Sequence, residues 1–120
     1  MANTVVWVDI PVLDLDRAIG FYAAVLGKEL HKVEYPGFAI GVLPGESGDA
    51  LGCLFIADEV QPSSQGPLVY LNCEGRLEEA VGVVDSAGGK VLQDKHQIGQ
   101  HGFRAIILDS EGNRIALHSH

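Results

Sequence analysis

The sequence predicts one α+β domain built from two tandem βαβββ modules that form a curved mixed sheet around a cavity. Three observations lead to this prediction. Residues 14–26 repeat apolar side chains at helical spacing, the segments that follow have the composition of strands, and the second half repeats the order of the first. Each helix can cover only one sheet face, so the other faces must be buried or must enclose a ligand.

The first half opens with β-branched and aromatic residues that predict a strand at 4–10. Asp14 offers a side-chain acceptor to the first amides of a helix predicted over 14–26, and Gly27 can end that helix in a left-handed conformation. Short apolar stretches then alternate with proline and glycine breaks. They predict further strands at 28–34, 37–43 and 50–56, followed by a linker at 58–66.

The second half is a copy of the first, displaced by 62 residues. Between 15–30 and 77–92, six of 16 positions are identical, and the order of strand, helix, glycine and strand is kept. The copy predicts a helix at 76–87 and strands at 67–73, 90–97, 102–109 and 113–119. We therefore expect a single domain over residues 1–120, with one module at about 1–57 and the other at about 67–120.

Composition restricts the partners and the location. Sixteen acidic residues against eight Lys and Arg give a formal net charge of −8, and the basic residues form no patch, so nucleic acid is not an expected partner. Cys53 and Cys73 lie in apolar runs, as buried free thiols do in a reducing compartment. No leader-like segment and no apolar run of about 18 residues occurs, so we expect no membrane partner and a cytoplasmic protein.

Three phrases resemble a known family: WVDIPVLDLDRAIGFYAAVLG, AGGKVL and the closing DSEGNRIALHS. They are similar to the vicinal oxygen chelate superfamily of glyoxalases, bleomycin-resistance proteins and extradiol dioxygenases, and the similarity extends over nearly the whole chain. The resemblance implies the tandem βαβββ fold. It also implies one divalent metal held on the sheet by four ligands, usually His, Gln or Glu, with open positions for two substrate oxygens.

The chain departs from the family at the metal positions. They fall on Trp7, near Gly52, Cys53 or Leu54, on Leu68 or Val69, and on Ala116. None offers the nitrogen or carboxylate that the family uses, and the thiol of Cys53 is left open as an exception. We therefore expect no metal ligands and no cofactor, and the resemblance does not decide whether the chain is an enzyme.

Alternation along the strands still directs polar and aromatic side chains toward the expected cavity. The expected ligand-binding residues are Trp7, Asp9, Tyr70, Asn72, Phe103, Ala116 and His118. Asp9 and His118 are the candidate catalytic pair, because a carboxylate orients an imidazole and raises its basicity. Alternatively, Asp9 is a hydrogen-bonded cavity residue and His118 a rim residue. Arg104 either neutralises an anionic substrate or forms an outer-face salt bridge, and His96 and His101 either edge the pocket or lie on the plain surface.

Three functional hypotheses follow. The chain binds a small, aromatic or antibiotic-like molecule without the usual metal site, as bleomycin-resistance relatives do. Alternatively, it is a lyase, isomerase or dioxygenase that uses Asp9 and His118, or it is a non-catalytic subunit or interaction module. A homodimer is expected in each case, because exposed sheet edges in this family commonly pair across a two-fold axis.

Overall fold

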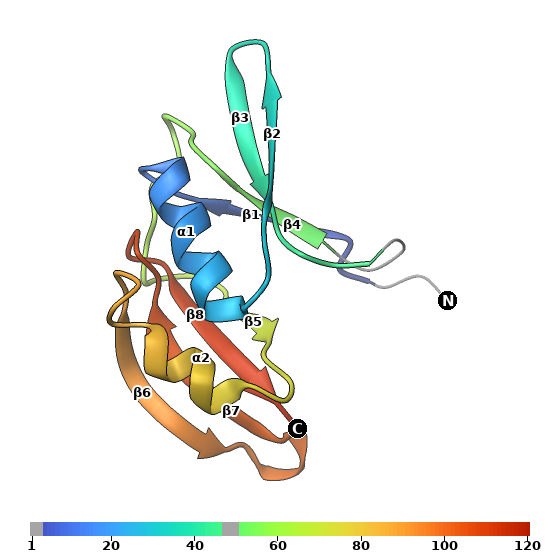
Figure 1. Cartoon of the computed structure of the whole chain (residues 1–120), viewed down its shortest axis with the longest axis vertical. Helices are drawn as coiled ribbons and strands as arrows, with labels where there is room; N and C mark the ends of the chain where they lie inside the picture. Colours follow the sequence, from blue (N-terminus) through green and yellow to red (C-terminus); the bar gives the residue numbers. More distant parts are fainter. Residues whose placement is uncertain (1–3, 47–50) are drawn as a thin grey trace.

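The computed structural model describes residues 4–46 and 51–120. These residues form eight strands, two α-helices and one short 3-10 helix (Figure 1). In chain order the elements are β1 (Trp7–Pro11), α1 (Leu15–Leu26), β2 (His31–Tyr35), β3 (Phe38–Val42), β4 (Leu51–Phe55), β5 (Val69–Asn72), α2 (Leu77–Val83), β6 (Lys90–Gln97), η1 (Gly99–His101), β7 (Phe103–Leu108) and β8 (Arg114–Ser119). Neither α-helix of the described ranges is long and apolar enough to cross a membrane.

The strands form two four-stranded sheets of the same topology. The order is β1-β4-β3-β2 in the first sheet and β5-β8-β7-β6 in the second, and the first strand of each runs parallel to its neighbour. The helices α1 and α2 begin 62 residues apart, at Leu15 and Leu77, which is the displacement found in the sequence. The α+β class and the tandem modules are thus confirmed, with the eight strands divided between two sheets.

Most element boundaries differ from the predicted ones by a few residues. β1 begins at Trp7 rather than at residue 4, because Trp7 pairs with Leu51 at the start of β4 and the residues before it lie exposed without a described partner strand. Residue 50, where the fourth strand was expected to begin, lies outside the described residues. α2 ends at Val83 rather than at residue 87, since residues 84–88 form turns that end at Gly88 with φ 106°. η1 was not predicted.

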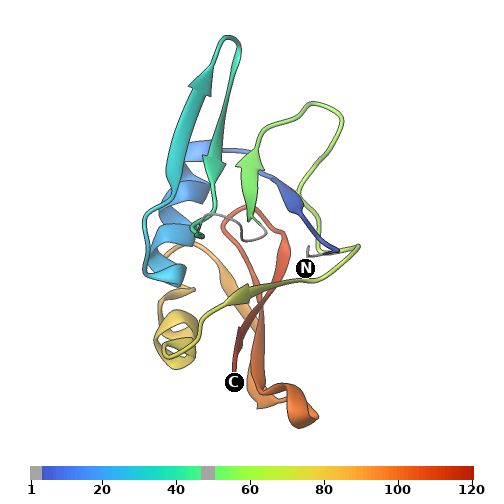
Figure 2. The same cartoon turned by 90° about the vertical axis from the view of Figure 1, so that its right-hand side faces the viewer.

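One hydrophobic core joins the two modules. It brings Phe21 and Tyr22 of α1 against Ile115 and Leu117 of β8, and none of these four side chains is more than 2% exposed. Both views show α1 and α2 side by side, each against the sheet of its own module (Figures 1 and 2). The helices and the core therefore occupy one face of each sheet, and the other face carries partly exposed side chains such as Trp7 and Tyr70.

The N-terminus of α1 is held by a carboxylate from the second module. Glu111, in the turn between β7 and β8, accepts hydrogen bonds from the backbone amides of Leu13 and Asp14, each at 2.9 Å. Its two oxygens also receive the Arg17 guanidinium in a forked pair, at 2.7 and 2.8 Å. The carboxylate satisfies free amides and opposes the positive end of the helix dipole. The Asp14 side chain adds a cap within the module, at 3.0 Å from the Arg17 amide.

The C-terminus of α1 is held by a cation that also comes from the second module. The last turn of α1 contains no basic residue, and Arg76 supplies one by donating to the carbonyls of Ala24 and Val25 at 3.4 and 3.2 Å. Gly27 ends the helix with φ 69°, and a Cβ atom there would lie 2.7 Å from the Arg76 guanidinium carbon. The left-handed conformation favours glycine here, and a side chain at position 27 would also have to displace the Arg76 guanidinium.

Buried polar side chains complete this junction. Asp109 accepts from the amides of Glu111 and Asn113 at 2.8 and 2.9 Å, and it also accepts from the Tyr22 hydroxyl. Asn113 donates to the Pro11 carbonyl at 2.8 Å. Burial, followed by the Asp109 carboxylate, raises the pKa of Tyr22, so its hydroxyl stays protonated and donates. The turn from Asp109 to Asn113 is therefore bonded to β1 and to α1 as well as to itself.

We predict that Glu111→Gln lowers the free energy of unfolding at pH 7 by about 3 kcal/mol, because it removes the buried charge that accepts from Arg17 and from the amides of Leu13 and Asp14. Burial acts to raise the pKa of Glu111, but the hydrogen bonds from Arg17, Asp14, Ser110 and Leu13 outweigh it and lower the pKa from 4.5 to about 2. The stabilisation is therefore complete above pH about 4.5 and declines as the pH falls toward 2. Urea unfolding at several pH values measures it.

The matched control is Glu78→Gln, which removes an exposed glutamate paired with Lys95 at 2.9 Å. An exposed pair of this kind contributes less than about 1 kcal/mol. Equal losses of stability in the two variants, or a Glu111→Gln effect that does not decrease in acid, would contradict the proposed role of Glu111 in holding the start of α1.

Candidate functional site

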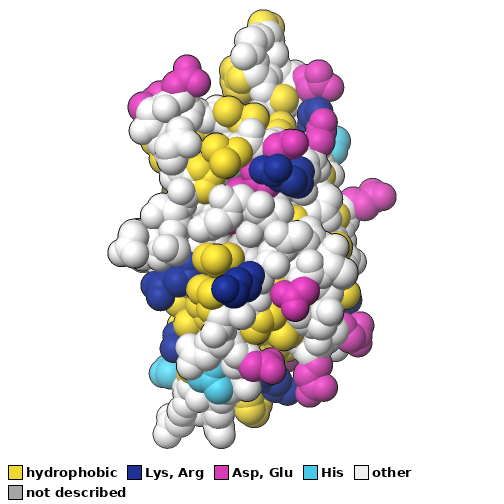
Figure 3. All heavy atoms as spheres, turned by 90° about the vertical axis from the view of Figure 1, so that its left-hand side faces the viewer, with side chains coloured by type: hydrophobic (Ala, Val, Ile, Leu, Met, Phe, Trp, Pro, Cys, Tyr) yellow, Lys and Arg dark blue, Asp and Glu magenta, His cyan; other side chains and the backbone are white. Residues whose placement is uncertain are grey.

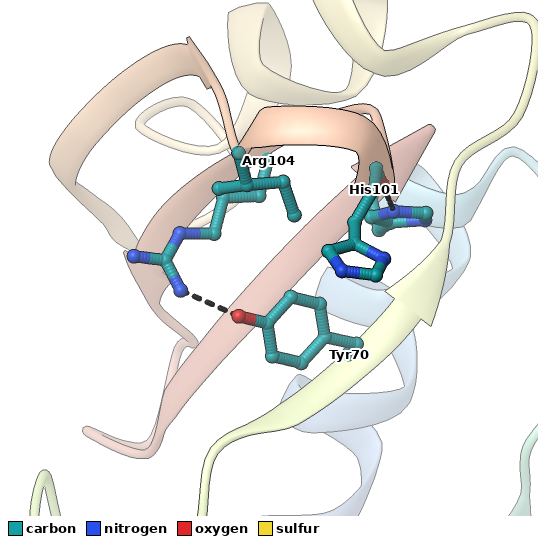
Figure 4. A pocket seen from close by; sticks show the side chains of 5 residues that line it. Tyr70, His101 and Arg104 are labelled. Atoms are coloured by element: carbon teal, nitrogen blue, oxygen red, sulfur yellow. Dashed lines mark hydrogen bonds between the residues drawn. The ribbon is translucent and has the colours of Figure 1, made fainter. Parts of the chain in front are cut away.

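A pocket of about 440 Å³ lies on the open face of the second sheet. Its position follows from strand alternation: Tyr70 and His118 point away from the core, whereas their neighbours Leu71 and Leu117 pack against it. Three elements and the turn around η1 meet here, and Figure 4 shows the side chains of Tyr70, His101 and Arg104 converging from them. The residues that line the pocket are Tyr70, Ile98, His101, Arg104 and His118.

The turn that carries η1 forms one wall of the pocket. Gly99 and Gly102 both adopt positive φ, 62° and 89°, and a Cβ atom at Gly102 would lie 2.2 Å from the carbonyl oxygen of Ser119. This close approach places His101 beside β8, where its backbone carbonyl lies 2.6 Å from His118 Nε2. A carbonyl can only accept, so the Nε2 of His118 carries a proton, and in the neutral ring Nδ1 is the basic nitrogen.

Arg104 is held between an aromatic and an imidazole side chain. Its Nη1 donates to the Tyr70 hydroxyl at 2.5 Å, shown as a dashed line in Figure 4, and its Nε donates to His96 Nε2 at 3.0 Å. The guanidinium carbon lies 6.0 Å from the centroid of the Tyr70 ring. The His118 ring also lies beside Tyr70, with 6.0 Å between the two ring centroids. The pocket thus presents one cation among flat rings.

Of the residues expected to bind a ligand, Tyr70 and His118 line this pocket. The other three on the second sheet have different surroundings. Asn72 accepts from the Glu74 amide at 2.8 Å, Ala116 is fully buried opposite Tyr70, and Phe103 packs against the core with Lys95 Nζ 4.9 Å from its ring centroid.

The remaining two expected residues, Trp7 and Asp9, lie on the first sheet. Asp9 Oδ1 accepts from Trp7 Nε1 at 2.7 Å and from the thiol of Cys53 at 3.4 Å. The strands that carry Asp9 and His118 belong to different sheets (Figure 2), and no hydrogen bond joins the two side chains in the described structure. The structure therefore does not assemble the proposed acid–base pair within one chain.

Sequence reasoning gave too little weight to Arg104 and its neighbours. In β7, Ala105 and Ile107 are buried on the core side of the sheet. Alternation along the strand therefore places Arg104 on the opposite side, which is the side of the pocket. Its pairing with His118 on one side and with His96 on the other is a matter of register, which the sequence did not fix. Strand alternation in the sequence could have identified Arg104 as a pocket residue, but nothing in the sequence indicated that His96 and Tyr70 bond to it.

Comparison with known proteins identifies the family and agrees with the observed fold. Residues 4–117 match the family model of the Glyoxalase/Bleomycin resistance protein/Dioxygenase superfamily. A glyoxalase/bleomycin resistance protein from Albidiferax ferrireducens is 17% identical with a TM-score of 0.73, covering 98% of this chain and 100% of that chain. A glyoxalase-related enzyme from Fulvimarina pelagi is 15% identical with a TM-score of 0.71, covering 98% and 88%.

A longer protein is also similar. A V278E mutant of glyoxalase I from Zea mays is 26% identical with a TM-score of 0.72, and the match covers 93% of this chain but 44% of that chain. No curated protein sequence matches the chain.

The metal that this fold family implies does not fit the residues present. Trp7 Nε1 is a donor occupied by Asp9, Ala116 has no ligating atom, and the Cys53 thiol donates its proton to Asp9. Among residues 4–46 and 51–120, no group of three or more His, Cys, Asp or Glu side chains is arranged to hold a metal ion.

We predict that Cys53 reacts slowly with 5,5′-dithiobis(2-nitrobenzoate) in the native protein at pH 8. Burial, followed by the Asp9 carboxylate, raises the pKa of the Cys53 thiol to about 11, and only the thiolate reacts. In a Cys73→Ala background, native labelling should be at least about 100-fold slower than labelling in guanidinium chloride.

Asp9→Asn should accelerate native labelling of Cys53, because it removes the carboxylate that disfavours the thiolate. Asp16→Asn, which changes an exposed carboxylate on α1, is the control and should have no effect. Fast native labelling of the parent protein would show that Asp9 and Cys53 do not interact as described.

Proposed function

We propose that this chain, which belongs to the Glyoxalase/Bleomycin resistance protein/Dioxygenase superfamily, binds a small aromatic or antibiotic-like molecule in the pocket on its second sheet. The observation that carries the proposal is the pocket itself. Its volume of about 440 Å³ lies in the range of small-molecule sites, and Tyr70, His101 and Ile98 give it flat and apolar walls. Arg104 and His118 supply a few polar groups that can orient a ligand.

Binding is better supported than the catalytic alternative. The lyase, isomerase or dioxygenase hypothesis relied on Asp9 acting with His118, and each of these side chains has other hydrogen-bond partners. The metal positions of the family lack suitable donors, as described above. Tyr70 and His118, by contrast, meet around one space large enough for a ligand.

The test of the proposal uses 2-naphthamide, a neutral bicyclic aromatic compound, and backbone amide NMR shifts. At about 0.3 kcal/mol per non-hydrogen atom, a compound of this size binds with a Kd of about 1 mM. We expect saturable shifts centred on the amides of Tyr70, His101, Arg104 and His118. Tyr70→Ala removes one aromatic wall and should weaken binding at least about threefold.

Tyr35→Ala is the matched control, because Tyr35 and Tyr70 are exposed to 46% and 44%. Tyr35 lies on the first sheet, stacked on Phe38, so its removal should leave binding unchanged. Shifts centred on the first sheet, or no saturable shifts at all, would refute the proposed pocket.

We also propose that the chain forms a homodimer. The open face of the first sheet exposes large apolar side chains, among them Trp7 at 45% and Phe38 at 59%, and a second copy of the chain can cover them. Sedimentation equilibrium should give twice the chain mass, and Trp7→Glu should shift the protein toward monomer because it places a charge in the covered face. Glu34→Gln, an exposed position on β2 at the opposite edge of the sheet from Trp7, is the control. A monomeric parent protein would refute the dimer.

A further inference from the structure

We infer that the ligand of this pocket is an aromatic carboxylate whose charged group is received by Arg104, an inference that rests on the proposed function. The pocket combines one fixed cation with flat walls. The cation can bind the carboxylate of such a ligand, and the flat walls can pack against its aromatic ring.

The positive charge of Arg104 is not paired within the described part of the chain. Its two hydrogen-bond partners are neutral: the Tyr70 hydroxyl at 2.5 Å and His96 Nε2 at 3.0 Å. The other arginines on which the fold depends, Arg17 and Arg76, each form an ion pair with a glutamate. Arg104 uses two of its five N–H donors in these contacts, so its Nη2 group and one Nη1 proton stay available to a carboxylate.

His96 acts as a positioning residue for Arg104. Its Nδ1 lies 2.9 Å from the Asp94 carbonyl, which can only accept, so Nδ1 carries a proton. Its Nε2 accepts the Arg104 Nε proton, so the imidazole is neutral and both of its nitrogens are engaged. The ring fixes the guanidinium without neutralising it, and the available N–H groups lie at the end of the side chain away from Nε.

The surroundings of Arg104 also favour an anion. The residues that line the pocket are Tyr70, Ile98, His101, Arg104 and His118, and none is acidic. Figure 3 shows histidine and basic side chains along one margin of the lower half of the molecule, whereas acidic side chains lie toward the other margin with some basic ones among them. The net charge of −8 repels anions at long range, but salt screens that field over about 10 Å, and the contact at Arg104 is shorter.

The test compares 2-naphthoate with 2-naphthamide, which have the same shape and differ in charge. A charge-assisted hydrogen bond is about twice as strong as a neutral one, so we expect the parent protein to bind 2-naphthoate about tenfold more tightly at pH 7. Backbone amide NMR titration measures both dissociation constants under one condition. The ratio of the two constants needs no variant, and it reports the charge preference alone.

Variants then assign the preference to named side chains. Arg104→Gln should reduce the ratio to within twofold, in a protein whose amide spectrum shows that it is folded. Lys90→Gln removes one positive charge at the exposed start of β6 and should keep the tenfold ratio. His96→Leu should lower the ratio because Arg104 loses its acceptor, whereas His96→Gln, which offers an oxygen near the same place, should restore part of it.

The outcomes separate this inference from the proposed function. Equal affinity of the parent protein for the two compounds overturns the carboxylate inference and leaves the pocket standing. A preference that survives Arg104→Gln in a folded protein also overturns it, because the charge would then be received elsewhere. Binding of neither compound overturns both proposals.

Discussion

The arrangement of the two modules depends on opposite charges at the two ends of α1. Glu111 meets the amides at the start of this helix and Arg76 meets the carbonyls at its end, and both side chains come from the second module. Each charge has the sign that the helix dipole favours. Because α1 packs on the first sheet, fixing both of its ends also fixes that sheet relative to the second module.

The contact between the two modules also explains why the core lies on only one side of each sheet. The core between helices and sheets buries the apolar side chains of both modules, and the polar turn from Asp109 to Asn113 satisfies its own amides within that core. Stability is therefore concentrated on the helix side of each sheet. Side chains on the other side of the second sheet contribute little to this core. Arg104, His96 and Tyr70 form a hydrogen-bonded group there.

Sequence reasoning predicted the architecture and part of the site. The displaced copy of LDRAIG in LEEAVG predicted the duplicated topology, and period-two alternation placed Tyr70 and His118 on one face. It did not predict that Glu111 caps a helix 97 residues earlier in the chain, because contact between distant segments has no local signal. Asp9 and His118 were expected on a single curved sheet, but their strands belong to two sheets and each side chain has other hydrogen-bond partners.

Gly27 and Arg76 link two distant positions of the chain in a way that restricts how the sequence can diverge. The guanidinium occupies the space that a side chain at position 27 would need, with 2.7 Å between its carbon and the Cβ site. In descendants of this sequence the two positions are expected to covary. An alanine at position 27 would have to displace the guanidinium and also adopt a left-handed conformation, and a shorter residue 76 would leave the last carbonyls of the helix to water.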